Sequence, residues 1–250
     1  MKISVAIITF NEENNIARCL KSVRLLADEI VVVDSLSTDK TIEIAQANGA
    51  RIVSQKFLGY IEQKNFAIDQ CSNDWVLSLD ADECLSDLLL ENLIQIKKKP
   101  ASADAYRMSR MTSYCGQWIK HGGWYPDKKV RLINKHQARW GGINPHDQLI
   151  VNGTTAEVKG DILHYSYHSI QGHQAQAEKF SSITADHLFS LGKKTSLIRI
   201  YVKPVVRFIR DFFFKAGFLD GKYGFVIARI SAHAVFLREK KLKALHDFQS

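Results

Sequence analysis

One stretch of this chain, Glu29-Ile30-Val31-Val32-Val33-Asp34, constrains the fold more than any other. It is short, rich in β-branched residues and apolar on both faces, which is typical of a strand buried inside a parallel sheet. Parallel strands need crossover connections between them, and these are usually helices. Three further strands of this kind are expected, at Lys2–Thr9, Arg51–Ser54 and Asp74–Leu79.

Helical segments separate these strands. They are expected over Ile16–Ser22, from the capping residues Ser37–Asp39 to about Asn48, over Ile61–Gln70, and from about Ser86. The alternation predicts an α/β fold with a Rossmann-like sheet flanked by helices. After Pro100 the pattern changes to short strands and long loops, so the sheet is expected to be mixed, although mainly parallel. From His173 onward the chain is expected to be helical, with a break at Leu219–Gly221.

The turn after the first strand contains no glycine, because the first glycine of the chain is Gly49. This excludes the Gly-x-Gly-x-x-Gly dinucleotide fingerprint and the Walker A loop at that turn. A nucleotide bound there must be held mainly by side chains.

Two carboxylates, Asp80 and Asp82, follow the apolar run Trp75–Leu79 directly. A buried strand that ends in this way delivers them to the carboxyl edge of the sheet, where open α/β sheets bind ligands. Hard oxygen ligands suit Mg²⁺ or Mn²⁺, which usually bind one or two carboxylates together with substrate phosphates. The pair therefore indicates a metal-bridged diphosphate. The alternative is that both residues only open the helix expected from about Ser86.

Composition sets broad limits. The 250 residues are enough for one large domain, or for a domain with an appendage. The four cysteines form no Cys-x-x-Cys pair, so reduced thiols in a cytosolic setting are expected, without a zinc site or a disulfide framework. The short apolar stretch at the start is interpreted as a strand and not as a signal peptide.

Four sequence blocks resemble a known family. They are Ile8-Thr9-Phe10-Asn11-Glu12, Val32 to Thr41, Gln63-Lys64-Asn65-Phe66-Ala67, and Leu79-Asp80-Ala81-Asp82-Glu83. In this order they resemble the inverting family 2 glycosyltransferases with a GT-A fold. The downstream stretches Trp124 to Leu132, Pro145-His146-Asp147 and His164-Tyr165-Ser166-Tyr167 resemble a subgroup that acts in lipopolysaccharide core biosynthesis.

The resemblance implies roles for individual residues. Nucleotide-sugar contacts are implied for Thr9, Asn11, Glu12, Asp34, Lys64 and Asp80, and metal ligation for Asp82. Plain capping is the alternative for Thr9 and Asn11. His164 is a candidate second metal ligand, whereas His168 and His173 are expected to be packed or hydrogen-bonded near the acceptor cleft.

An inverting transfer needs a general base for the acceptor hydroxyl. Asp147 is the candidate, because the subgroup usually has a His-Glu pair where this chain has His146-Asp147. The carboxylate is kept, although the side chain is shorter. Asp127 and Glu83 remain rival candidates, and a loop salt bridge is the structural alternative for Asp147.

The end of the chain is basic. The net charge is +8, and Leu197–Ser250 contains 11 Lys and Arg against 4 Asp and Glu. Arg199, Lys203, Arg207 and Arg210 form one helical stripe beside many apolar and aromatic residues. A basic amphipathic helix of this kind suits an anionic membrane surface, and the broad apolar face argues against nucleic acid. A helix packed on the catalytic body, or a dimer contact, is the alternative.

Together these observations predict a GT-A catalytic domain over residues 1–172, with a nucleotide-sugar half (1–100) and an acceptor half (101–172). Residues 173–250 are predicted to form a basic helical region. The expected activity is metal-dependent transfer of a hexose, with UDP-glucose as the expected donor, to a lipid-linked saccharide such as the lipopolysaccharide inner core. The enzyme is expected in the cytoplasm, peripheral on the inner face of the cytoplasmic membrane.

Two alternatives to this function remain open. One is transfer to a polyprenyl phosphate or a capsule precursor. The other is a catalytically silent module that binds sugar nucleotide or membrane.

Overall fold

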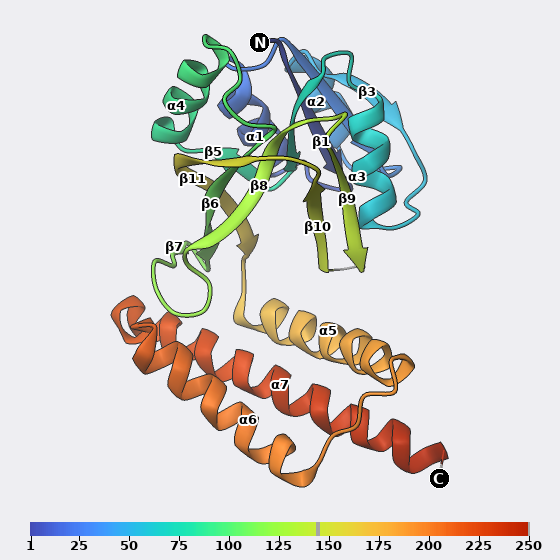
Figure 1. The fold of residues 1–250 in the computed structure, drawn as a ribbon, viewed down its shortest axis with the longest axis vertical. Helices are drawn as coiled ribbons and strands as arrows, with labels where there is room; N and C mark the ends of the chain where they lie inside the picture. Colours follow the sequence, from blue (N-terminus) through green and yellow to red (C-terminus); the bar gives the residue numbers. More distant parts are fainter. Residues whose placement is uncertain (144–145, 250) are drawn as a thin grey trace. The chain divides into compact units, whose positions relative to one another are not determined.

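The computed structural model describes residues 1–143 and 146–249 and divides into two compact units (Figure 1). Unit 1 comprises Met1–Met111 and Asp127–Tyr165, and unit 2 comprises Thr112–Pro126 and the chain from Ser166. The predicted boundary after residue 172 lies inside a helix, and residues 112–126, which the sequence assigns to the acceptor half, belong to unit 2. A compact unit need not fold independently, so the predicted division into residues 1–172 and 173–250 stays a prediction.

Unit 1 is an α/β structure. Its elements are β1 (Ile3–Thr9), α1 (Ile16–Val23), β2 (Glu29–Asp34), α2 (Thr41–Ala47), β3 (Arg51–Ser54), α3 (Tyr60–Asp69), β4 (Trp75–Asp80), β5 (Glu83–Leu85), α4 (Asp87–Lys97), β6 (Ala105–Tyr114, which continues into unit 2), β8 (Asp127–Asn134), β9 (Ala138–Ile143), β10 (His146–Val151) and β11 (Thr155–Tyr167, which also continues into unit 2). The expected strands and helices of the first hundred residues are present with ends shifted by a residue or two.

The main sheet is mixed, as predicted. Its strands run in the order β3-β2-β1-β4-β8-β6-β11-β5, and β3, β2, β1 and β4 are parallel. The pairs β4–β8, β8–β6 and β11–β5 are antiparallel. The predicted α/β fold with flanking helices is therefore confirmed, and the parallel part ends at β4, the strand that carries Asp80.

Helices cover both faces of the parallel strands. Ile3, Val5 and Ile7 of β1 pack into one buried cluster with residues of α1 and α4, whereas Ala6 packs into a second cluster with residues of α3. The valines of β2 divide between the same two clusters. Each fully buried Val or Ile contributes about 1.5–3 kcal/mol relative to an exposed one. This burial on both faces explains why the strand is apolar at successive positions.

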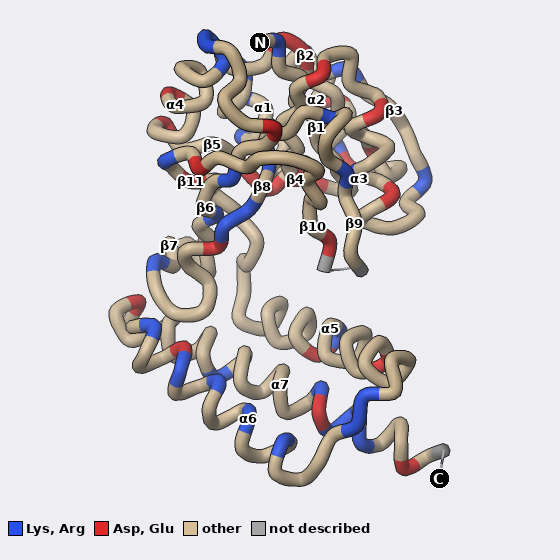
Figure 2. The backbone as a smooth tube through the Cα atoms, in the orientation of Figure 1, with Lys and Arg blue, Asp and Glu red and all other residues tan. Residues whose placement is uncertain are grey.

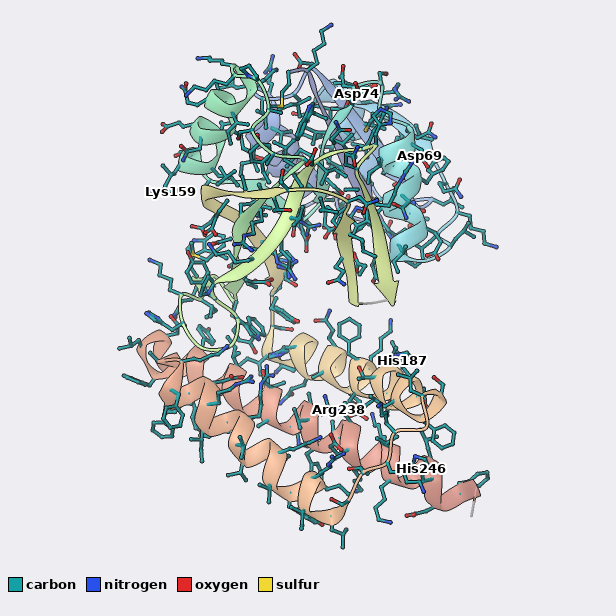
Figure 3. The ribbon with its side chains drawn as sticks, in the orientation of Figure 1. Asp69, Asp74, Lys159, His187, Arg238 and His246 are labelled. Atoms are coloured by element: carbon teal, nitrogen blue, oxygen red, sulfur yellow. The ribbon has the colours of Figure 1, made fainter. Side chains whose placement is uncertain are left out.

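The hairpin β9–β10 is fastened to α3. The N–H of Trp140 donates to Oδ1 of Asn65 at 3.0 Å, and Nδ2 of Asn65 donates to the carbonyl of Trp140 at 2.9 Å. Arg139 also pairs with Asp69 at the end of α3, which Figure 3 labels. These contacts place the hairpin beside the helix that carries Lys64.

Unit 2 contains β7 (Gln117–Trp118) and a group of helices: α5 (Ile170–Ser190), α6 (Leu197–Ile209), a π-helical turn (Arg210–Phe214), a 3₁₀ turn (Gly217–Asp220) and α7 (Gly221–Gln249). The expected helical character and the break at Leu219–Gly221 are present, and a second break lies at residues 191–196. Among the described residues, no helix is both long and apolar enough to cross a membrane.

An aromatic cluster joins the segments of unit 2. Tyr114 contacts the rings of Trp124, Tyr167, His173 and Tyr223 at centroid distances between 5.3 and 5.7 Å. The hydroxyl of Tyr114 lies 3.0 Å from Nδ1 of His173, and burial lowers the pKa of His173 to about 4. His173 is therefore a packed, neutral imidazole, in keeping with the expectation of a packed His, but its neighbours are the aromatic residues of unit 2.

Buried carboxylates pair with three residues of the predicted basic stripe. Glu239 of α7 lies 2.9 Å from Nζ of Lys203, and Asp211 pairs with Arg207 at 2.6 Å and with Arg210 at 2.8 Å. Three of the four residues in the predicted lipid-binding stripe thus have partners inside unit 2. The sequence pattern did not predict that these basic residues would form ion pairs within the protein.

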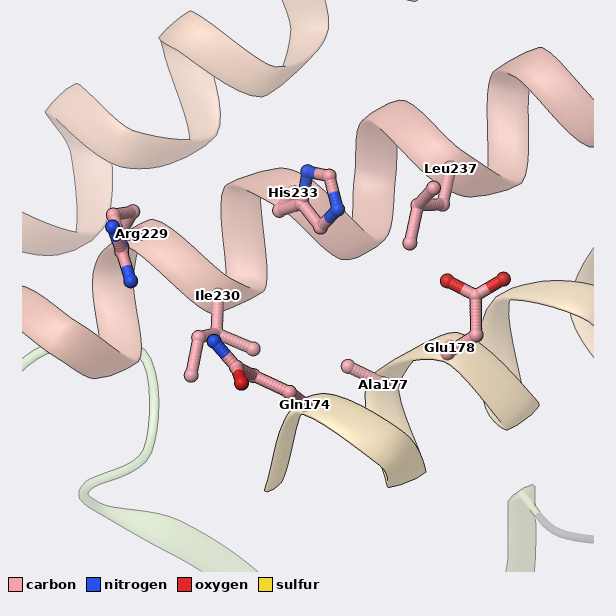
Figure 4. A pocket seen from close by; sticks show the side chains of 7 residues that line it. All are labelled: Gln174, Ala177, Glu178, Arg229, Ile230, His233 and Leu237. Atoms are coloured by element: carbon pink, nitrogen blue, oxygen red, sulfur yellow. The ribbon is translucent and has the colours of Figure 1, made fainter. Parts of the chain in front are cut away.

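A pocket of about 370 Å³ opens between α5 and α7 (Figure 4). It is lined by Gln174, Ala177, Glu178, Arg229, Ile230, His233 and Leu237. Its charged residues have opposite signs, and no predicted site residue lines it. The pocket therefore offers no support for the predicted chemistry.

We expect Glu239→Gln to lower the thermal stability of unit 2 at neutral pH. Burial alone raises the pKa of Glu239, but hydrogen bonds from Thr195, Lys203 and Arg238 outweigh it and lower the pKa to about 2. A depressed carboxyl pKa contributes stability above the unfolded-state pKa of about 4.5, and this contribution is lost as the pH falls toward the folded-state value. The difference in Tm between the wild type and the variant should therefore shrink between about pH 5 and pH 3. A constant difference would contradict this account.

Candidate active site

The site is built at the carboxyl edge of the parallel strands. In the register of the sheet Thr9 pairs with Asp34, and Ile8 pairs with Asp80. Three strands of unit 1 therefore deliver polar side chains to one edge, which is the position where open α/β sheets bind ligands.

The loops after β1 and β2 are joined by hydrogen bonds. Asn11 adopts a left-handed backbone (φ 55°), which Asn tolerates better than most residues. Its N–H donates to Oγ of Ser37 and its Oδ1 accepts from the N–H of Thr38, both at 2.9 Å. Glu12 donates its N–H to Thr41 and accepts from the side chain of Asn15. Asn11 and Glu12 thus make hydrogen bonds that hold the two loops together. Their predicted contacts with a nucleotide stay predictions.

Asp34 and Thr9 differ in how they are satisfied. Asp34 is fully buried and accepts from the N–H of Ser37 at 2.8 Å and from the hydroxyl of Ser37. The buried hydroxyl of Thr9 makes no hydrogen bond within the part of the chain that the structure describes. A buried polar atom without a partner is costly, so Thr9 fits a position that a ligand or water satisfies.

Asp80 ends β4 among three cationic side chains. Its Oδ1 lies 3.2 Å from Nζ of Lys64, and its Oδ2 lies 3.5 Å from Nη2 of Arg131. Burial raises the pKa of Asp80, but the charges of Lys64, Arg131 and Arg110 outweigh it and hold the pKa well below its ordinary value. Asp80 is therefore an ionised carboxylate at neutral pH. The helix-start alternative does not hold, because β5 intervenes and Ser86 caps α4.

Glu83 is sealed beneath this edge. Its side chain is fully buried; Oε2 accepts from the N–H of Asp80 at 3.2 Å, and Oε1 lies 2.7 Å from Arg131 and 3.3 Å from Arg110. Because both oxygens have partners and no solvent access, Glu83 is poorly placed to accept a proton from an acceptor. Arg110 also pairs with Asp127 at 2.9 Å, and Lys129 lies 3.2 Å from the other oxygen of Asp127.

Asp147 enters the site from β10. Its Oδ2 lies 2.8 Å from Nζ of Lys64, so Lys64 bridges Asp147 and Asp80. The ammonium of Lys64 also lies 4.3 Å from the ring centroid of Trp140. Of the motif around Asp147, Asn144 and Pro145 lie outside the described residues. The salt bridge named as the alternative for Asp147 is thus present, with Lys64 as its partner, and the role of Asp147 as base stays a prediction.

Asp82 and His164 form a second pair. Pairing of β11 with β5 places His164 opposite Glu83, and Nε2 of His164 lies 3.1 Å from Oδ2 of Asp82. An imidazole nitrogen and a carboxylate oxygen at this separation suit two ligands of one divalent cation, with phosphate oxygens and water completing its shell. Within the described residues, no three His, Cys, Asp or Glu side chains gather into a metal-binding group. The oxygen and nitrogen ligands of Asp82 and His164 fit a divalent cation whose other ligands are phosphate oxygens and water.

Sequence reasoning missed Arg131, Arg110 and Trp140 as parts of the site. Arg131 carried a signal, because it is a charged residue inside the apolar strand Val130–Ile133 and is almost fully buried. A charge in such a position needs a buried partner of opposite sign. Trp140 carried no comparable signal, since its place beside Lys64 depends on how the hairpin docks.

Comparisons with known proteins agree on one family. The family described as "Glycosyl transferase family 2" matches residues 4–151. An uncharacterized glycosyltransferase of Rickettsia typhi is 38% identical over 255 residues, covering 98% of this chain and 87% of the relative. The lipopolysaccharide core biosynthesis glycosyltransferase LpsC of Rhizobium meliloti is 28% identical over 257 residues, covering 100% and 95%.

A solved structure was also compared. Glucosyl-3-phosphoglycerate synthase of Mycobacterium tuberculosis, in complex with Mn²⁺, UDP and glucosyl-3-phosphoglycerate, is 27% identical, with a TM-score of 0.37 and coverage of 45% of this chain and 44% of that one. The likeness to the Rickettsia and Rhizobium proteins extends over nearly the whole chain, whereas this one extends over less than half.

We expect Arg131→Met to destabilise the protein by about 3–5 kcal/mol, because the buried Glu83 loses the nearer of its two arginines and keeps only the longer ion pair, to Arg110. The matched variant Arg110→Met should cost less, about 1–2 kcal/mol, since Glu83 keeps Arg131 and the half-exposed Asp127 can be hydrated. Urea unfolding followed by circular dichroism measures both losses. Equal losses would contradict the central place given to the Glu83–Arg131 pair.

Proposed function

Because this chain belongs to glycosyl transferase family 2, we propose that it moves a hexose from a nucleotide sugar, with UDP-glucose as the donor, onto a lipid-linked saccharide. The proposed acceptor is the lipopolysaccharide inner core or a close relative. The observation that carries the proposal is the cluster of Lys64, Asp80 and Asp147 at the carboxyl edge of the sheet. It combines a carboxylate from the donor half with a carboxylate from the acceptor half around one ammonium group.

The donor is proposed to lie along the loops that follow β1, β2 and β4. Thr9 has a buried hydroxyl without a hydrogen bond to the described residues, which supports a ligand contact there. The carboxylate of Asp34 accepts from Ser37 and has further lone pairs, with which it can accept from a base N–H or a ribose hydroxyl. Lys64 can balance negative charge on the diphosphate, because a lysine ammonium acts as a compact cation beside phosphate oxygens.

Asp82 and His164 would hold a Mg²⁺ or Mn²⁺ ion together with the diphosphate. Such an ion, when bound, neutralises charge on the departing nucleoside diphosphate. The two side chains are 15% and 21% exposed for His164 and Asp82, so both are accessible from the sheet edge while being largely fixed in place.

Asp147 is proposed as the general base. The acceptor hydroxyl loses its proton to the carboxylate of Asp147 while its oxygen bonds to the anomeric carbon and the bond from that carbon to the diphosphate breaks. The attack comes from the face opposite the leaving group, so the configuration inverts. In the described residues Asp147 pairs with one cation, Lys64, whereas Asp127 pairs with two, Arg110 and Lys129, so Asp147 is the less constrained carboxylate.

The lipid-linked acceptor is supported by similarity to LpsC over the whole chain, and by the basic, apolar character of unit 2. We accordingly propose a place in the cytoplasm, peripheral to the inner face of the cytoplasmic membrane. Transfer to a polyprenyl phosphate or a capsule precursor would use the same donor chemistry.

A panel of nucleotide sugars, screened by thermal shift with Mn²⁺, tests the donor assignment. Membership of an enzyme family favours catalysis over a silent binding module.

We expect Asp82→Ala to abolish transfer and to remove metal-dependent UDP binding, because the diphosphate would lose the ligand that links it to the ion. Calorimetry with UDP, in the presence and absence of Mn²⁺, measures this. Asp74→Ala is a matched control, since Asp74 is an exposed carboxylate at the opposite end of β4. Metal-dependent affinity that equals the wild type in Asp82→Ala would sink the assignment.

We expect Asp147→Asn to leave donor affinity nearly unchanged and to lower kcat by about 100-fold or more, as for a lost general base. Asp147→Glu keeps a carboxylate and should retain much more activity, whereas Asp127→Asn should stay within a few-fold of the wild type. Steady-state kinetics on a defined acceptor would separate these variants. A kcat for Asp147→Asn close to that of the wild type would place the base elsewhere, with Asp127 the next residue to test.

A further inference from the structure

The outward side of α6 in unit 2 is apolar. The exposed apolar residues of this helix are Leu197, Ile198, Tyr201, Val202, Val205, Val206 and Ile209, and the exposed cations Arg199 and Lys203 lie between them in the sequence. The spacing of the apolar residues places them on one side of the helix, and Phe213, Phe214, Phe218 and Leu219 of the next two turns are exposed as well. We call these residues the α6 apolar face. A surface helix normally turns such a stripe toward the core.

Other residues in and after α6 pack within unit 2, which fixes the orientation of the helix. Ile200 is buried, and the ring of Phe208 contacts those of Phe212 and Phe225 at 5.4 and 5.8 Å. The carboxylate of Asp211 is buried between Arg207 and Arg210. The apolar residues thus face outward while other residues of α6 already fill the inward side.

The exposed charges of the segment that carries this face all have one sign. Within residues 191–222, every one of which the structure describes, both carboxylates, Asp211 and Asp220, are buried. The exposed charged residues in this range are Lys193, Lys194, Arg199, Lys203, Arg210, Lys215 and Lys222. Figure 2 shows the Lys and Arg positions along α6 in blue. Within residues 191–222 the exposed charged side chains are therefore all cationic, and two of them, Lys203 and Arg210, also pair with the buried carboxylates of Glu239 and Asp211.

We propose that the α6 apolar face inserts into the interfacial region of a bilayer that contains anionic lipid. An apolar stripe bordered by Lys and Arg matches the headgroup boundary, where alkyl groups enter the acyl region and cations meet lipid phosphates. A second copy of this chain is a poorer occupant, because it would bring two sets of cations together. The inference deepens the proposed function and rests on it, since a lipid-linked acceptor requires the enzyme to reach a membrane.

This arrangement gives the apolar residues the larger share of the lipid contact. The sequence pattern assigned the contact to the basic stripe together with its apolar neighbours, yet Lys203, Arg207 and Arg210 are paired with Glu239 and Asp211. The apolar residues carry the insertion, and the exposed cations add an attraction that salt screens. Binding should therefore weaken as salt rises but keep a salt-resistant part.

The test compares the full-length wild type with Ile198→Gln/Val205→Gln/Phe214→Gln. The three residues are 73%, 56% and 84% exposed, so polar replacements leave the packing of unit 2 intact. Leu25→Gln/Leu88→Gln is the matched control, with exposures of 75% and 54% in unit 1. Co-sedimentation uses vesicles of phosphatidylglycerol and phosphatidylcholine in equal parts, and vesicles of phosphatidylcholine alone, over a salt series.

The wild type and the control should bind the anionic vesicles, and part of this binding should survive high salt. The triple variant should bind at least about 100-fold more weakly, because it loses three apolar insertions. The proposal is overturned if the wild type does not bind at low salt, if the triple variant binds as the wild type does, or if sedimentation shows a dimer that only the triple variant dissociates. UDP-sugar hydrolysis by each protein is measured in parallel. If the wild type hydrolyses UDP-sugar but does not bind vesicles, only the membrane contact is overturned. If the wild type does not hydrolyse any UDP-sugar, the result counts against the proposed function.

Discussion

The buried carboxylate of Glu83 is the constraint on which the site depends. A fully buried anion has to be paired, and Glu83 obtains two arginines and a backbone N–H. Arg131 extends the pairing to Asp80, and Lys64 extends it from Asp80 to Asp147. Positive and negative side chains therefore alternate in space, from Arg131 on β8 through Asp80 and Lys64 to Asp147 on the hairpin. Each group is held in place by its neighbours, which gives side chains from distant parts of the chain one shared geometry.

The hairpin shows how packing and charge act together. Asn65 fastens β9 to α3 through two hydrogen bonds, and the next residue toward the start of the helix, Lys64, reaches Asp147 on β10. The ring of Trp140 covers the ammonium group and also lies 5.3 Å from the guanidinium of Arg131. A shielded ammonium interacts more strongly with carboxylates than an exposed one does. Donor-side and acceptor-side groups are thus linked through the packing of one helix.

Much of the fold could be predicted from local pattern, because strands apolar on both faces are possible only in a covered sheet. The Asp80-Ala81-Asp82 signal was readable for the same reason, as a strand end has a known place in such a sheet. The contacts between Asp82 and His164, and between Lys64 and Asp147, depend on strand register and hairpin docking, which no local pattern encodes. For α6 the periodicity was readable from the sequence, but which side faces inward was not. That choice depends on Glu239, which is distant in sequence, and on Asp211, whose burial is decided by the packing of unit 2.

The outward apolar side of α6 has a consequence for how the stability of the protein is measured. Vesicles that bind the folded chain through this face more tightly than they bind the unfolded chain add a binding free energy to the folded state. The apparent midpoint of unfolding then rises with the vesicle concentration although no internal contact has changed. The unfolding midpoint measured with vesicles would therefore differ from the midpoint measured in buffer alone. The difference would measure partitioning and not the strength of the core.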